Sequence, residues 1–307
     1  MPNQPETNVS SPPARESISS VYVGSAKIFQ LLRQTWWGPE LMNLGYHPWY
    51  GGLGLLASGL RSRSVAQRRL ATNAIALLGV QAGDRVLDVA CGRGGSSYMI
   101  RHSTPAATVH AIDLLPENIE IAHRIFPSSQ TLTYQQGDAQ NLAFPDGTFH
   151  KVFCCEAAFH FPDRGQFLKE AGRVLLPNGR LVVVDFVWRS PKHREGRTHE
   201  LGQLVRKVWE WEDMSTEDEY QAMATAAGLR RVRCDDWTNP VTRSLQHAAE
   251  LVIGLQKKSW GRWLVMKMHP LLSSFTPEDW VEIEQEVAAH RFLLEHTYYK
   301  AMVFEKA

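Results

Sequence analysis

Strand-like and helix-like segments alternate through the middle of the chain, and this alternation limits the fold more than any other feature. Runs rich in branched and aromatic residues predict strands at 85–90, 108–113, 131–138, 150–157 and 180–187. Helical patterns lie between them at 96–102, 116–126 and 163–175, and "PNG" at 177–179 predicts a turn. Such alternation is typical of an α/β protein with a parallel, doubly wound sheet.

Two further predicted strands, at 230–237 and 298–306, complete a Rossmann-like sheet of seven strands. A capping-box pattern, Thr216 with Glu219, begins a helix that ends before Gly228, and Thr276 begins another. The remaining helical segments are expected to form a lid over the carboxyl edge of the sheet, where open α/β sheets bind ligands. We therefore predict a disordered tail (1–20), a helical lid (21–78), a cofactor-binding core (79–190), a second lid and substrate region including strand six (191–290), and a last core strand (291–307).

Charge and composition exclude several classes of protein. The chain of 307 residues carries 33 basic and 32 acidic residues, which argues against nucleic acid or an anionic membrane as the main partner. No apolar run approaches the roughly 18 residues of a membrane span, and the Pro- and Ser-rich N-terminus does not resemble a signal peptide. The four cysteines lack zinc-ligand spacing. We expect a cytoplasmic protein with reduced thiols and no metal site.

Acidic residues and glycines mark the ends of three consecutive predicted strands. The stretch "VLDVACGRGG" places Asp88 in a buried strand and Gly92 and Gly94 in the loop behind it. Asp113 ends the second strand, about twenty residues beyond the glycines, where an acidic side chain reaches a ribose diol. Asp138 ends the third strand and can accept a hydrogen bond from an exocyclic amine. Together they predict a nucleoside site.

Two nucleoside cofactors fit this pattern, a nicotinamide dinucleotide and S-adenosylmethionine. The dinucleotide fingerprint G-x-G-x-x-G fails because its last position is Ser97. The carboxylate of Asp88 suits a ligand with a cationic end better than a pyrophosphate. A NAD-dependent oxidoreductase remains a remote alternative.

The motifs "VLDVACGRGG", "VHAID", "GDAQNLAFPDGTFHKVFCCEA" and "LLPNGRLVVVD" resemble those of class I S-adenosylmethionine-dependent methyltransferases. The resemblance implies that the glycine loop lies under the methionine part of the cofactor. It also implies that Asp113 binds the ribose hydroxyls, and that Asp138 and the Ala139 backbone bind the adenine. Cofactor contacts are further expected from Leu114 and Cys155. Arg93 is expected to be solvated and receives no role.

A narrower resemblance comes from "CCEAAFHFPD" and "WWGPELMNLGY". Glu156, His160 and Pro162 are spaced as in sterol and tocopherol-type C-methyltransferases and in the sugar O-methyltransferase of rebeccamycin assembly. His160 is then the candidate base. Asp185, which ends the fifth strand, would orient His160 or take the proton. Glu156 would hold the amino end of the cofactor or face a cation.

Large aromatic residues are frequent in the predicted lid segments, and the chain has 10 tryptophans. They favour a large apolar acceptor, and Tyr22 is expected to fold over the cofactor. We therefore predict methylation of an alkene carbon in an isoprenoid-bearing or polycyclic natural product of secondary metabolism, with a fainter resemblance to the prenyl C-methyltransferase of teleocidin assembly. The alternatives are O-methylation with His160 as base, and a cofactor-binding module without catalysis. The N-terminal helices could form a homo-oligomer.

Overall fold

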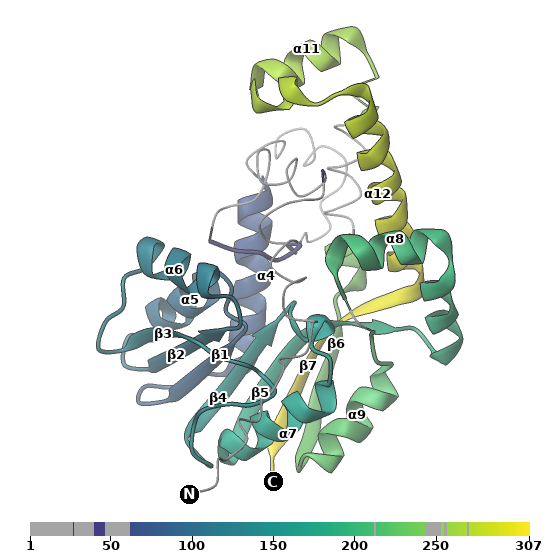
Figure 1. The fold of residues 1–307 in the computed structure, drawn as a ribbon. Coiled ribbons are helices and arrows are strands. Elements are labelled where there is room, and N and C mark those ends of the chain that lie inside the picture. The colour runs from purple at the N-terminus through teal and green to yellow at the C-terminus, as the bar shows by residue number, and fades with distance from the viewer. Residues whose placement is uncertain are drawn as a thin grey trace, which may run out of the picture.

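The computed structural model describes residues 27, 40–46, 62–211, 213–242, 253–254, 257–268 and 270–307. Its centre is a mixed sheet of seven strands in the order β3-β2-β1-β4-β5-β7-β6 (Figure 1). Neighbouring strands run parallel except β7, which is antiparallel to both β5 and β6. The strands are β1 (Arg85–Val89), β2 (Thr108–Asp113), β3 (Leu132–Gln136), β4 (Phe149–Cys155), β5 (Leu175–Trp188), β6 (Leu229–Asp236) and β7 (Thr297–Lys306). The predicted Rossmann-like sheet is confirmed.

Helices cover both faces of this sheet, and two separate hydrophobic clusters define the two faces. Side chains of α4, α5 and α6 share one cluster with Val182 and Val184, while those of α7 and α9 share the other with Leu181 and Val183. Alternate residues of β5 therefore point to opposite faces, and all four are fully buried. Each such side chain contributes about 1.5–3 kcal/mol by leaving water.

The α-helices include α4 (Ser62–Leu78), α5 (Gly95–Ser103), α6 (Pro116–Ile125), α7 (Arg164–Val174), α8 (Glu200–Trp209), α9 (Glu217–Ala226), α11 (Ser259–Met268) and α12 (Pro277–His296). Short 3-10 turns are η2 (Ala158–His160), η3 (Pro191–Thr198) and η4 (Pro270–Ser274). The capping box of Thr216 and Glu219 is present at the start of α9, and Thr276 forms another with Asp279 at the start of α12. Both predicted helix starts are confirmed.

The predicted turn at 177–179 falls inside β5 rather than before it. Leu175 pairs with Phe149, and the pairing resumes five residues later on β5 and two later on β4, where Arg180 faces Lys151. Asn178 adopts a left-handed backbone with φ 61°, as a turn requires. The predicted turn is present, but the strand continues on both sides of it.

The described tryptophans are divided between the core and the surface. Trp188, Trp209 and Trp211 are buried in the hydrophobic core, whereas Trp260 and Trp263 on α11 are 58% and 62% exposed. Figure 1 shows α11 at the far end of α12, away from the sheet. Four other aromatic residues of the prediction, and Tyr22, lie outside the described residues: Trp36, Trp37, Trp49 and Tyr50. The proposed lids and domain boundaries therefore remain predictions.

No helix among the described residues combines the length and the apolar character that crossing a bilayer requires.

Candidate active site

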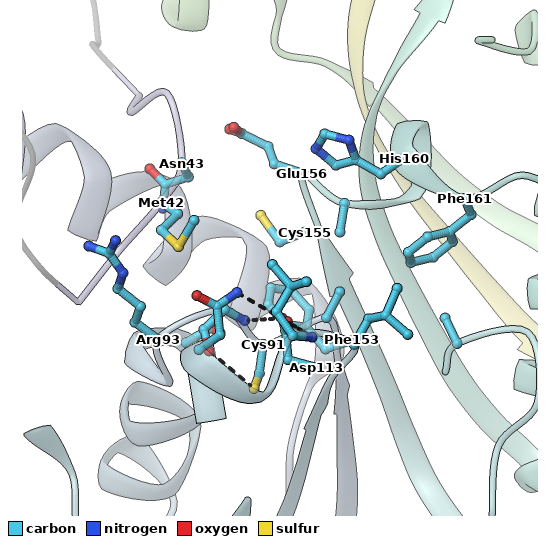
Figure 2. A pocket seen from close by; sticks show the side chains of 18 of the residues that line it. Met42, Asn43, Cys91, Arg93, Asp113, Phe153, Cys155, Glu156, His160 and Phe161 are labelled. Atoms are coloured by element: carbon cyan, nitrogen blue, oxygen red, sulfur yellow. Dashed lines mark hydrogen bonds between the residues drawn. The ribbon is translucent and has the colours of Figure 1, made fainter. Parts of the chain in front are cut away.

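A cavity of about 310 Å³ lies at the carboxyl ends of four adjacent strands. The loops behind β1, β2, β3 and β4 form its walls, and residues 40–43 approach from the other side. Figure 2 shows Asp113 and Cys91 at one end and Glu156 with His160 at the other. The cavity lies at the edge of the sheet where the sequence predicts a ligand-binding site.

Asp88 has a structural partner for its carboxylate. The side chain is buried, and its Oδ2 accepts hydrogen bonds from the hydroxyls of Ser96, at 2.7 Å, and Ser97, at 2.6 Å. Burial raises the pKa of this carboxyl to about 6, while the two serine hydroxyls oppose the shift. Asp88 does not line the cavity and instead connects β1 to the first turn of α5. Ser97, which breaks the dinucleotide fingerprint, is therefore one of the two serines that bind Asp88.

The two glycines assigned to the cofactor lie in different surroundings. Gly92 lines the cavity with a left-handed backbone, φ 55°, and its N–H donates to Asp113 Oδ2 at 2.8 Å. Gly94, with φ 82°, packs against Tyr134, and a Cβ there would lie 2.8 Å from that ring. Gly94 does not line the cavity, so packing within the protein accounts for this glycine.

Asp113 is oriented in the cavity wall by three hydrogen-bond donors. Its Oδ1 accepts from Leu115 N at 3.0 Å and from Asn118 Nδ2 at 3.1 Å, while Oδ2 accepts from Gly92. Burial raises the pKa of this carboxyl, and the three donors oppose the shift. Since a carboxylate oxygen can accept two hydrogen bonds, Oδ2 keeps the capacity to bind a hydroxyl of a ligand. These residues fit a nucleoside.

The remaining cofactor candidates also border the cavity. Leu114, Asp138, Ala139 and Cys155 all line it, and Asp138 Oδ1 accepts from Gln140 N at 2.9 Å. Burial raises the pKa of the Cys155 thiol well above its usual value, so this cysteine is a neutral packing group.

Arg93 corrects one expectation. The sequence predicted a solvated side chain, but Arg93 is only partly exposed and lines the cavity next to Gly92 (Figure 2). Because its guanidinium is always charged, it brings a permanent cation to the cofactor end.

Glu156 follows β4 directly and is held by residues far away in the sequence. Its backbone is left-handed, φ 53°, which is uncommon for a residue with a side chain. Leu44 N lies 3.0 and 3.1 Å from its two carboxylate oxygens, and Tyr299 OH donates to Oε1. Both donors are distant from Glu156 in the sequence, because one belongs to Leu44 and the other to β7.

His160 ends η2 beside Glu156 and lines the same cavity (Figure 2). Its Nδ1 lies 3.4 Å from the carbonyl oxygen of Glu210. Because a carbonyl only accepts, Nδ1 carries the proton and Nε2 carries the lone pair. Burial lowers the pKa of His160 to about 4, the Glu210 carbonyl opposes this, and the charge of Arg164 adds to it. The imidazole is therefore neutral near pH 7.

Asp185 is not brought to the cavity. It is fully buried, and its Oδ2 accepts from Tyr220 OH at 2.9 Å and lies 3.7 Å from Arg164 Nε. Burial raises the pKa of this carboxyl to about 6, against the opposing effect of Arg164 and Tyr220. A direct bond to His160 is not among its contacts, so its predicted role as a proton acceptor has no geometric support.

Among the described residues, no group of three or more His, Cys, Asp or Glu side chains is placed to hold a metal ion.

The comparisons with known proteins agree with this geometry. Residues 87–183 match the family model of a methyltransferase domain. The 27-O-demethylrifamycin SV methyltransferase of Amycolatopsis mediterranei is 33% identical over 201 residues, which cover 63% of this chain and 71% of that protein. The chloroplastic tocopherol O-methyltransferase of Arabidopsis thaliana is 27% identical over 251 residues, which cover 76% of this chain and 70% of that protein.

Among solved structures, the geranyl diphosphate C-methyltransferase of Streptomyces coelicolor A3(2), in complex with S-adenosyl-L-homocysteine, superposes with a TM-score of 0.68. The match covers 97% of this chain and 100% of that one at 14% identity, so it shows the shared fold. The site and fold define a nucleoside-binding α/β enzyme. The chain belongs to the S-adenosylmethionine-dependent methyltransferases, and S-adenosylmethionine is its cofactor.

Several residues of this site have no local signal in the sequence. Leu44, Glu210 and Tyr299 contact the candidate catalytic pair through a backbone amide, a backbone carbonyl and a hydroxyl. They are 112, 50 and 143 residues away from the side chains that they contact. A prediction of these contacts requires the tertiary structure.

Proposed function

We propose that this methyltransferase methylates an alkene carbon of a small, largely apolar acceptor, with His160 as the final proton acceptor. The observation that carries the proposal is the position of Glu156 and His160 side by side on one wall of the cavity (Figure 2). S-adenosylmethionine supplies an electrophilic methyl group. The residues of the cavity must then orient the acceptor, exclude water and receive a proton.

At the cofactor end, Asp113 is proposed to bind the ribose hydroxyls. Asp138 and the backbone of Ala139 would bind the adenine, and Gly92 would lie under the methionine part. The support is their common position along the cavity wall and the remaining capacity of Asp113 Oδ2. Gly94 and Asp88 would act indirectly, by shaping the loop between β1 and α5.

At the acceptor end, the charge that methylation creates decides which residues are useful. When the π electrons of an alkene form the new bond to methyl, the methyl–sulfur bond of the donor would break with its electron pair staying on sulfur, and the neighbouring carbon becomes a carbocation. Glu156 places a carboxylate at this end of the cavity, and an opposite charge nearby stabilises a cation. Loss of a proton from the adjacent carbon to His160 Nε2 would then restore an alkene.

The weak basicity of His160 favours carbon over oxygen. A general base works best when its pKa lies near the operating pH, and that of His160 is lowered to about 4. Such an imidazole is poorly matched to the proton of an alcohol. A C–H bond next to a carbocation is far more acidic, so even a weak base removes its proton.

O-methylation is the second candidate function. The relative from Amycolatopsis is named for an O-demethylated substrate, and the relative from Arabidopsis is named as an O-methyltransferase. In that reaction His160 would take the hydroxyl proton before or during transfer.

The test is an acceptor assay with isotopically labelled methyl donor and two matched prenylated phenols. One keeps the alkene and has its hydroxyl blocked as an ether; the other keeps the hydroxyl and has a saturated chain. We expect label in the first compound, attached to carbon, as located by mass spectrometry and NMR. Label only in the second compound would establish O-methylation and overturn the proposal.

A further inference from the structure

We propose that Arg164 is a positioning residue, which holds Asp213 against the core so that the carbonyl of the nearby Glu210 orients the imidazole of His160. The inference deepens the proposed function and rests on it. Arg164 begins α7, four residues after His160, and it lies outside the cavity. Its role would therefore be exerted through His160 rather than on the acceptor.

Two parallel tethers join these two parts of the chain. His160 Nδ1 bonds to the carbonyl of Glu210, and Arg164 Nη2 donates to the carbonyl of Asp213. Glu210 adopts a left-handed backbone, φ 47°, where α8 ends, a conformation that costs a residue with a side chain about 1 kcal/mol or more. Surrounding contacts must hold such a backbone in place, and Arg164 supplies one of them.

Asp213 is well suited to transmit this restraint. Its Oδ1 accepts from Trp188 Nε1 at 3.1 Å and from Met214 N at 2.8 Å, while Arg164 binds its carbonyl. The chain is thus fastened to β5 and to α7 at one residue, three positions after the carbonyl that meets His160.

Arg164 is itself held by the buried acid that the sequence assigned to catalysis. Its Nε lies 3.7 Å from Asp185 Oδ2, which also accepts from Tyr220 OH at 2.9 Å. The backbone N–H of Phe159, the residue before His160, is a further donor to this carboxylate. Asp185 therefore contacts both the arginine and the turn that carries His160. Burying a charged pair of this kind costs free energy of desolvation. We attribute its presence in this protein to the position that it gives to the turn carrying His160.

The same arginine also acts on the charge of the imidazole. Four ionisable residues belong to the elements next to His160: Glu156 after β4, Arg164 on α7, Asp185 on β5 beside Arg164, and Glu210 after α8, which meets the ring through its backbone carbonyl. The positive charge of Arg164 works together with burial to keep His160 neutral. Removal of Arg164 should thus disturb both the orientation of His160 and its protonation.

The experiment compares three variants of the full chain. Arg164→Met removes the tether but leaves the Asp185 carboxylate buried without its cation. The double variant Arg164→Met with Asp185→Asn also removes this unpaired buried charge, so it tests the proposal even if the single variant does not fold. The matched control is Arg197→Met, because Arg197 also contacts Asp213, at 3.2 Å, but from an exposed position.

The readouts are kcat, the KM of the cofactor, and the tautomer and titration of His160 by NMR on nitrogen-labelled histidine. We expect kcat to fall roughly 10- to 100-fold in the double variant, because a misplaced catalytic group costs about this much, while the KM of the cofactor is maintained. The Nδ1-protonated tautomer should be lost and the titration of His160 should move upward. Arg197→Met should match the wild type in every readout.

A folded double variant that keeps the tautomer, the titration and kcat would overturn the proposal. An equal loss of kcat and cofactor binding would also overturn it, since that marks a structural role only. If His160→Ala proves as active as the wild type, the proposed function fails, and the NMR tautomer alone then decides whether Arg164 positions the ring.

Discussion

The two ends of the cavity are built in different ways. At the cofactor end, Asp113 is held by Gly92, Leu115 and Asn118, all within 21 residues of it in the chain. At the acceptor end, Glu156 and His160 are held from Leu44, Tyr299 and Glu210, at separations of 112, 143 and 50 residues. A site with local partners forms wherever the strand–loop–helix unit forms. A site with distant partners depends on the whole domain.

The acceptor end should show the largest single effect. His160→Ala removes the proposed proton acceptor, and kcat should fall by about 10²- to 10⁴-fold. Binding of S-adenosylhomocysteine should be unchanged, because His160 lies at the other end of the cavity from Asp113 (Figure 2). Titration calorimetry and product assays measure the two properties separately.

The matched control is His102→Ala, which removes an exposed histidine near the end of α5. A fall in kcat of less than about threefold for His160→Ala would show that His160 is not the proton acceptor at this end of the cavity.

The cofactor end should respond in binding instead. Asp113→Asn removes the charge and sets an amide N–H against a backbone donor, either Gly92 N or Leu115 N. The affinity for S-adenosylhomocysteine should fall roughly 100-fold, which corresponds to about 3 kcal/mol for bonds to a charged group. Calorimetry on Asp146→Asn, an 80% exposed carboxylate, provides the comparison. Equal affinities of the two variants for S-adenosylhomocysteine would show that Asp113 does not bind the cofactor.

The same contrast explains how much the sequence could predict. The sheet, the helix starts at Thr216 and Thr276, and the line of residues Asp113, Asp138 and Ala139 follow from short segments with a clear pattern. Local sequence patterns are misleading where the burial of a side chain decides whether it reaches the cavity. Asp88 and Asp185 are both buried and do not line the cavity. Asp88 bonds to two serines, and Asp185 contacts an arginine and a tyrosine.

Long-range contacts could not be predicted at all. Nothing near Tyr299 or Leu44 indicates that their donors meet Glu156. The tryptophans show the same limit, because composition alone does not distinguish the buried Trp211 from the exposed Trp263.

The pH dependence of stability offers a sharper test of the acceptor end. His160 has a pKa of about 4 in the folded protein and about 6.5 when unfolded, so the unfolded chain binds its proton first as the pH falls. The contribution of His160 to stability is therefore fully present above pH ~6.5 and is lost progressively down to pH ~4. At pH 5 the loss amounts to about 2 kcal/mol.

His160→Gln should remove this loss. Relative to the wild type, the variant should gain about 2 kcal/mol in free energy of unfolding between pH 7.5 and pH 5, measured by urea denaturation. The buried acids Asp88 and Asp185 titrate in both proteins, so their effect cancels. Parallel pH profiles of variant and wild type would mean that the imidazole is not desolvated.

The smallest expected effect concerns the support of Glu156 from β7. Tyr299→Phe removes the hydroxyl that donates to this carboxylate and keeps the buried ring. The protein should lose about 1 kcal/mol of stability, and the KM of the acceptor should rise more than the KM of the cofactor, because the carboxylate loses the donor from β7 and keeps the bond from Leu44 N. The neighbouring Tyr298→Phe is the natural comparison, since Tyr298 points to the other face of β7 and packs under Arg189 and Lys300. If both variants shift the two KM values alike, the hydroxyl of Tyr299 serves the fold alone, and the acceptor end depends less on distant partners than its geometry indicates.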